Sequence, residues 1–105
     1  MMATRVEHVE RISGKGRLTA GENVYTVDYV INIYQRYAES TPLPRFARGR
    51  LTGMNAVAVV RAMSPLKVLD LELQDGRHAQ VILENLDGDF DVTGAIRPAP
   101  EQKRE

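Results

Sequence analysis

The chain has 105 residues, 43% of them hydrophobic and 27% charged, which is the length and balance of one globular domain with a single core. It contains no cysteine, so disulfides, thiolate metal sites and cysteine nucleophiles are excluded. Its 14 basic and 14 acidic residues cancel, with a modest basic excess in residues 1–52 and an acidic excess in residues 53–97. This balance argues against strong non-specific nucleic-acid binding but leaves room for a local basic face.

The N-terminal sequence lacks the features of a targeting segment. Residues 1–12 include acidic residues and no apolar run of the kind found in secretory signals. No stretch of the chain approaches the roughly 18 apolar residues that a membrane span needs. We therefore expect a soluble, cytoplasmic protein.

The first half of the sequence predicts a long β-hairpin. Residues 23–37 are rich in β-branched and aromatic residues and alternate between an apolar and a polar face. Residues 11–20 are predicted to form the partner strand, joined to it by a short loop around residues 21–23. The apolar face of this hairpin comprises Ile12, Gly14, Gly16, Leu18, Tyr25, Val27, Tyr29, Ile31 and Ile33.

A loop, a short strand and a helix are predicted next. Residues 39–45 contain two prolines, which cannot donate hydrogen bonds to a ladder, and a strand pattern resumes at residues 46–53. Residues 55–63 fit the i, i+3, i+4, i+7 spacing of an amphipathic helix, with Asn55 as a suitable N-cap. Three valines in this segment would also suit a strand. The helix would bury Ala56, Val59, Val60 and Met63.

The last third of the sequence predicts a three-stranded antiparallel meander. Apolar and polar residues alternate in residues 66–74, 78–86 and 90–96. An Asp-Gly pair separates the first two strands at Asp75, and another separates the last two at Asp87. Asp-Gly is favoured in type I′ turns, in which both central residues have positive φ.

These elements predict an all-β, mainly antiparallel fold: a small six-stranded barrel or strongly bent sheet, with one short helix near residues 55–63 closing an end. The β-barrel-like domain would span residues 1–97, and the polar residues 98–105 would form a disordered tail. The expected core comprises Ile12, Leu18, Val27, Tyr29, Ile31, Leu51, Val60, Leu69, Leu71, Leu73, Val81, Leu83, Phe90 and Val92.

The tetrapeptide Gly-Arg-Leu-Thr occurs twice, at residues 16–19 and 49–52. The flanking sequences differ, so the repeat is not part of a duplicated unit. In both copies Gly and Leu fall on one strand face, and Arg and Thr fall on the other. Leucine would fill the core, while the adjacent glycine would allow the close backbone approach that a small closed sheet requires. The repeat is interpreted mainly as strand architecture.

The two copies also suggest a candidate anion site, if their strands are neighbours. Guanidinium groups clamp phosphates and an aromatic ring can stack on a base, so such a face would suit a nucleotide or nucleic acid. The candidate residues are Lys15, Arg17, Arg48 and Arg50, with Arg45 and Phe46 at the rim.

Tyr34 falls on the polar face of the predicted hairpin, whereas Tyr25, Tyr29 and Tyr37 share the opposite face. Exposed tyrosines suit protein interfaces, so Tyr34 and Arg36 are candidate interface residues. Small barrels are often binding modules, an inference that rests on fold analogy alone. We expect a non-enzymatic module that binds a protein partner or a second copy of itself; the alternative is an anion or nucleic-acid binder that uses the basic face.

Catalytic and metal sites are not indicated by the sequence. The two histidines, His8 and His78, do not have the spacing of metal ligands. Asp87 begins an alternating acidic run, but positions six and twelve of a calcium loop would be Val92 and Pro98 instead of Gly and Glu. P-loop and nucleophile-elbow patterns are absent. We expect no enzymatic activity, no metal and no cofactor.

Overall fold

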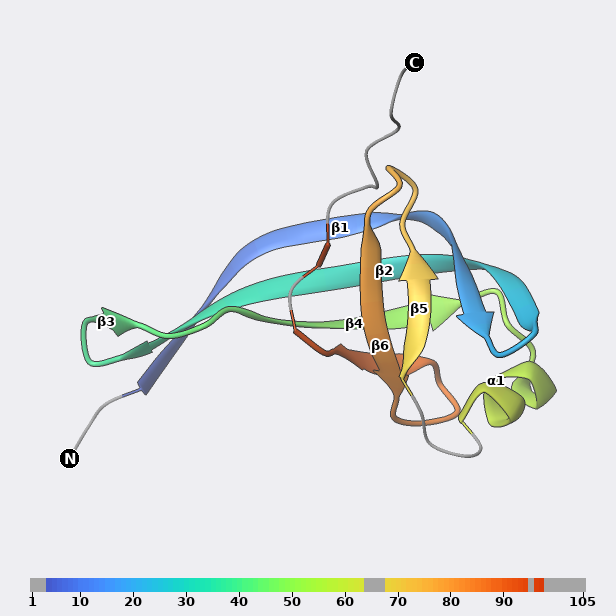
Figure 1. Ribbon diagram of the computed structural model, residues 1–105. Helices are drawn as coiled ribbons and strands as arrows, with labels where there is room; N and C mark the ends of the chain where they lie inside the picture. Colours follow the sequence, from blue (N-terminus) through green and yellow to red (C-terminus); the bar gives the residue numbers. More distant parts are fainter. Residues whose placement is uncertain (1–3, 64–67, 95, 98–105) are drawn as a thin grey trace, which may run out of the picture.

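The computed structural model describes residues 4–63, 68–94 and 96–97, and in these the chain forms seven strands, all paired antiparallel, and one helix (Figure 1). The predicted antiparallel fold with one short helix is confirmed. The tail predicted for residues 98–105 lies outside the described residues. The elements are β1 (Thr4–Ala20), β2 (Asn23–Ala38), β3 (Thr41–Pro42), β4 (Phe46–Thr52), α1 (Ala56–Met63), β5 (Leu69–Glu72), β6 (His78–Leu83) and β7 (Asp89–Val92).

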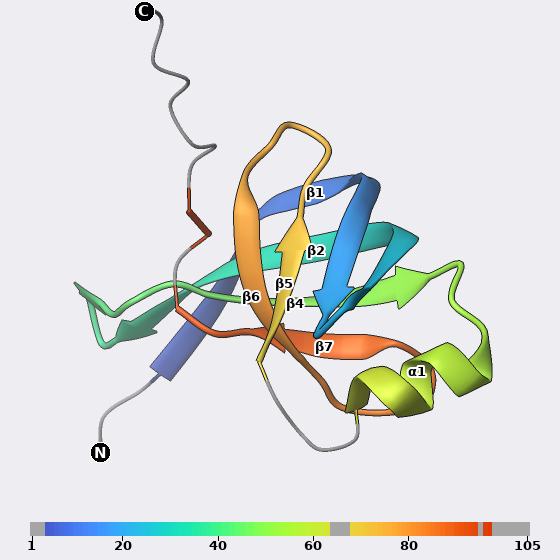
Figure 2. The same cartoon turned by 45° about the vertical axis from the view of Figure 1, so that its right-hand side comes forward.

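Six of these strands form a ring-like closed sheet. Their order is β1-β5-β6-β7-β4-β2, and β2 pairs with β1 to complete the ring. The two-residue β3 is added to the end of β2. Figure 2 shows β5 and β6 crossing over β1 and β2, with α1 beside one end of the ring. This arrangement agrees with the predicted six-stranded barrel or strongly bent sheet.

The β1–β2 hairpin extends well beyond the ring (Figure 1). The two strands pair from Thr4↔Ala38 to Ala20↔Asn23, with a bulge between His8 and Glu10. We call residues 4–10 of β1, residues 33–38 of β2 and β3 the arm. The sequence predicted β1 only from residue 11, because residues 4–10 lack apolar alternation; in the structure every one of them is exposed.

The hydrophobic core lies inside the ring and confirms the predicted set except at one position. Ile12 and Val92 are partly buried against the core, and the other strand residues of the set are buried. Val60 was expected to be buried and is instead 47% exposed, whereas Val59 is 4% and Ala62 1% exposed. The helix α1 is rotated so that its small Ala62 meets the core, and this rotation carries Val60 into solvent.

The start of α1 follows the predicted capping. The backbone N–H of Ala58 donates to Oδ1 of Asn55 at 2.8 Å, which satisfies a donor that the first helical turn leaves free. The N–H of Val59 donates to the backbone carbonyl of Asn55 at 3.1 Å. The segment Ala56–Met63 therefore forms a helix and not a strand.

The Asp-Gly turns differ in type from the prediction. Gly76 has a φ of 90°, but the φ of Asp75 is not positive, so the turn is not type I′. The N–H of Gly76 donates to the carbonyl of Leu73 at 3.0 Å, so a conventional turn comes first and a left-handed glycine follows it. The same arrangement recurs at Gly88, whose N–H donates to the carbonyl of Asn85 at 3.3 Å.

Both glycines of the Gly-Arg-Leu-Thr repeat lie where other atoms approach the backbone closely. A Cβ at Gly16 would overlap the backbone carbonyl oxygen of Glu72 on β5. A Cβ at Gly49 would overlap the carbonyl oxygen of Val30 and lie 2.5 Å from Cζ of Phe90. The leucine of each copy is buried. These contacts agree with the interpretation of the repeat as strand architecture.

Candidate functional site

The strands that carry the two repeats are not neighbours. β2 lies between them and pairs with β1 along one edge and with β4 along the other. Lys15 and Arg17 therefore stand on one side of β2, and Arg48 and Arg50 stand on the other. All four are on the outward face, because the core-facing glycines and leucines alternate with them.

Each of these basic residues has an acidic residue opposite it on a neighbouring strand. Lys15 pairs in register with Asp28, and Arg17 pairs with Glu72. The register places Arg48 opposite Asp91 and Arg50 opposite Asp89 across β4 and β7, and both pairs form ion pairs. The predicted basic face is thus a face of alternating charge, which attracts a phosphate far less than four free cations would.

The ion pair at Arg50 alters the titration of both partners. The hydrogen bond from Arg50 is the main cause of a lowered pKa at Asp89, and a second hydrogen bond, from Asn85 at 2.9 Å, acts in the same direction. The pKa of Arg50 is raised, mainly by its hydrogen bond to Asp89.

An acidic pair lies nearby on the same face. A hydrogen bond to Asp91 and the negative charge of that residue raise the pKa of Glu84. Negative charge is therefore crowded at this end of β7.

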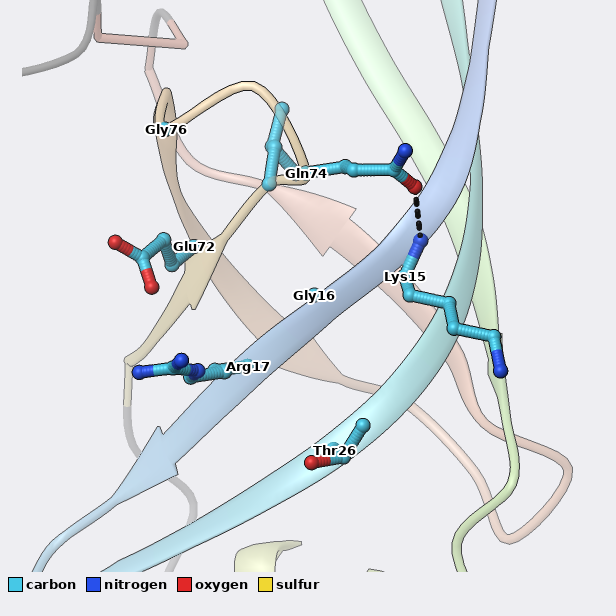
Figure 3. A pocket seen from close by; sticks show the side chains of 8 residues that line it. Lys15, Gly16, Arg17, Thr26, Glu72, Gln74 and Gly76 are labelled. Atoms are coloured by element: carbon cyan, nitrogen blue, oxygen red, sulfur yellow. Dashed lines mark hydrogen bonds between the residues drawn. The ribbon is translucent and has the colours of Figure 1, made fainter.

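Lys15 and Arg17 line a shallow hollow of about 420 Å³ between β1 and the end of β5 (Figure 3). The backbone N–H of Lys15 donates to Oε1 of Gln74 at 3.0 Å, while the Lys15 side chain points away from that residue. Arg17 and Glu72 point to the same side of the hollow (Figure 3). Lys15 and Arg17 bring two cations to the hollow and Glu72 brings one carboxylate, so the hollow is a mixed polar surface and not a purely basic one.

Three of the remaining candidate residues meet in an aromatic cluster where the arm joins the ring. The rings of Tyr34 and Phe46 are stacked, with centroids 5.1 Å apart, and the His8 ring meets Tyr34 edge-on at 5.5 Å. The guanidinium of Arg36 lies 4.6 Å from the centroid of Phe46, and that of Arg48 lies at 5.9 Å. The Phe46 ring, which was expected to stack on a base, is thus already in contact with Tyr34 and Arg36 of the same chain.

The feature that sequence reasoning missed is the free edge of the arm. Among the described residues, β1 has a second strand partner only at Arg17–Thr19, so residues 4–13 pair with β2 alone. This edge exposes two large apolar side chains, Val6 at 53% and Val9 at 41%. The alternating charges of the segment obscured it, because they resemble those of a solvated loop.

No protein-family model, curated protein or solved structure matches this chain. None of the helical structure in the described residues has the length and hydrophobicity of a membrane span. In the same residues, no three His, Asp or Glu side chains are grouped so that they could hold a metal ion. Function is therefore inferred from the geometry of the arm and its surroundings.

Proposed function

We propose that the protein is a non-enzymatic interaction module that associates with a second copy of itself through the free edge of the arm. The supporting observation is the unpaired β1 edge over residues 4–13, which exposes Val6 and Val9. Such an edge presents a row of backbone donors and acceptors to any strand of matching sequence.

The arm has little core of its own to stabilise it. Residues 4–10 of β1 are all exposed, and the two-residue β3 adds only a short third strand. An isolated two-stranded ribbon is at best marginally stable in water. A strand from another chain would supply both backbone hydrogen bonds and cover for the exposed Val6.

The sequence of the edge complements itself in an antiparallel register centred on Val6. Around a two-fold axis at Val6, Arg5 faces Glu7 of the second copy, Glu7 faces its Arg5, and the two Val6 side chains meet. Arg5 and Glu7 lie on one face of the strand, where they form an ion pair at 3.4 Å within the single chain. Shifting the axis to Arg5 or to Glu7 would set like charges against each other, which is unfavourable.

The bulge between His8 and Glu10 limits the length of this pairing. A bulge interrupts a regular ladder and increases its twist, so the paired segment would run from Thr4 to His8. Contacts this small are typical of weak, reversible association. We therefore expect dimers that form with rising concentration.

Charge reversal tests the register. Arg5→Glu and Glu7→Arg should each abolish concentration-dependent dimerisation in sedimentation velocity, because each places like charges opposite one another. The double variant Arg5→Glu/Glu7→Arg should restore dimers. An equimolar mixture of the two single variants should form a heterodimer, since one chain then carries two acids and the other two bases.

Glu22→Arg is the matched control, because it reverses an exposed acidic residue at the opposite end of the hairpin. Circular dichroism melts should show that every variant retains the fold, including the Arg5 variant, which loses a contact with Tyr37 at 4.6 Å. A wild-type protein that stays monomeric at millimolar concentration would refute the proposal. So would single variants that dimerise as wild type does.

An anion or nucleic-acid surface on Lys15, Arg17, Arg48 and Arg50 has less support, because each of these residues stands opposite an acid. A steep loss of oligonucleotide affinity with rising salt would favour that alternative. We expect no such binding in physiological salt.

A further inference from the structure

A cavity of about 620 Å³ lies between the base of the arm and the far end of the ring, separate from the β1 edge. Its volume falls in the usual range for small-molecule sites. It is surrounded by residues from β2, the start of β4, the β5–β6 turn and the segment after β7. Its apolar lining is Ile33, Pro44, Phe46, Ala47 and Ile96, and its basic lining is Arg45 and Arg77.

The floor of the cavity is continuous with the hydrophobic core. Ala47 is buried in that core, and Ile33 and Ile96 pack against it. A ligand with an apolar body would therefore bury its surface on side chains that are already held in place. Such burial is worth about 25 cal/mol for each Å² removed from water.

Arg45 is held at the cavity by a neutral partner. Its Nε–H donates to Oε1 of Gln35 at 3.0 Å. Nε2 of Gln35 in turn donates to the backbone carbonyl oxygens of Leu43 and Arg36. The amide thus fixes the stem of the guanidinium and leaves its two terminal nitrogens for another acceptor.

The charge of Arg45 is also uncompensated. Within the part of the chain that the structure describes, no carboxylate lies within 4.0 Å of its guanidinium. This distinguishes it from the outward-facing Arg48 and Arg50, which have Asp91 and Asp89 as partners. A planar guanidinium that is positioned and unpaired matches the two oxygens of a carboxylate.

Arg77 has a different role on the other side of the cavity. Its Nε–H donates to Oδ2 of Asp75 at 2.7 Å, and its backbone N–H donates to Oδ1 at 3.0 Å. The backbone hydrogen bond is the main cause of a lowered pKa at Asp75, so this carboxylate stays ionised and neutralises Arg77. Arg45 is therefore the cation that remains for a ligand.

We propose that this cavity binds a small amphipathic carboxylate. Its carboxylate would accept the terminal N–H groups of Arg45, and its apolar body would lie over Ile33, Ala47 and Ile96. A single free guanidinium balances one negative charge, which favours a monocarboxylate over a phosphate dianion. No residue of β1 lines the cavity, so binding is independent of the association proposed for the arm.

Decanoate is a suitable probe below its micelle concentration, with amide chemical shifts of the ¹⁵N-labelled full chain as the readout. We expect saturable shifts at Ala47 and Ile96. Decanol and decylammonium should bind at least about tenfold more weakly, because a charged hydrogen bond is lost or the ligand charge is repelled. Arg45→Ala should weaken decanoate to the same degree. Arg45→Lys should bind decanoate with an affinity between those of wild type and Arg45→Ala, since lysine keeps the positive charge but lacks the planar pair of N–H donors.

Arg17→Ala removes one positive charge on the outward face and should leave the decanoate affinity unchanged. Amide spectra of each unliganded variant establish that it is folded. Three results would overturn the proposal: no saturable shift at millimolar decanoate, equal affinity for decanol and decanoate, or an Arg45→Ala affinity equal to that of wild type.

Discussion

Arg50 on β4 and Asp89 on β7 face each other at a closure point of the ring, with Nε 2.7 Å from Oδ1. The pair belongs to a strand register in which Gly49, beside it, passes beneath Phe90. One tetrapeptide thus supplies both the close approach on the inner side and the ion pair on the outer side. The arginine that sequence reasoning assigned to an anion is already bound to a carboxylate of its own chain.

Removing the Asp89 carboxylate should flatten the acid dependence of stability. The pKa of Asp89 is lowered in the folded state, so its ionised form stabilises the fold above its ordinary pKa of about 4. That contribution is lost as the pH falls through the lower folded value. Melting temperatures measured from neutral to acidic pH should therefore fall less steeply for Asp89→Asn than for wild type. Parallel profiles would show that the ion pair adds nothing in solution.

Asp91→Asn should lower the pKa of Glu84 towards its ordinary value. The raised pKa of Glu84 has the hydrogen bond and charge of Asp91 as its largest causes, and the substitution removes that charge. A carbon-detected NMR titration of the Glu84 carboxyl would measure the change directly. Asp28→Asn, on β2, is the matched control and should leave the titration unchanged. An unaltered Glu84 titration in the Asp91 variant would mean that the two carboxyls do not interact.

Valine at either repeat glycine should destabilise the ring. Gly16→Val and Gly49→Val would force Cβ atoms into backbone carbonyl oxygens on the adjacent strands, so we expect a loss of about 1–3 kcal/mol or more in unfolding free energy. Urea denaturation measures the unfolding free energy of each variant. Thr52→Val, an exposed change in the same repeat, should stay within about 0.5 kcal/mol. Wild-type stability in both glycine variants would remove the architectural explanation of the repeat.

The two adjacent valines of α1 should respond in opposite ways to a charge. Val59 is buried, and Val59→Asp would place an unpaired carboxylate in the core and abolish cooperative unfolding. Val60 is exposed, and Val60→Glu should change stability by no more than about 0.5 kcal/mol. Thermal melts distinguish the two. A severe loss in the Val60 variant would indicate that this face is covered in solution.

Much of the ring was predictable because its strands are half buried. Leu69, Leu71 and Leu73 alternate with polar residues, and this alternation fixed both the strand and its inner face. Residues 4–10 of β1 carry no such signal, because they are exposed on both faces and have no reason to alternate. A helix of eight residues also tolerates more than one apolar stripe, which is why Val60 was assigned to the wrong side.

The candidate site was harder to predict than the fold. Alternation shows which face a residue occupies but not which strand lies next to it, so the insertion of β2 between the two repeats could not be read from the sequence. The acids opposite Arg48 and Arg50 come from β7, far along the chain. The place of Arg45 at a cavity could not be predicted either, because it depends on a hydrogen bond to Gln35 and on a loop that alternation does not describe.

Ring closure sets the order in which the chain can bury its apolar surface. The β1–β2 hairpin is local and is synthesised before the β5–β7 meander, whereas Leu18 finds its partner Leu71 only across half of the chain. Until the β5–β7 meander has been made, the ring cannot close over Val27 and Ile31, and such long-range pairing is slow to form. The nascent chain therefore passes through a stage with a long apolar ribbon exposed, which is when aggregation competes most strongly with folding.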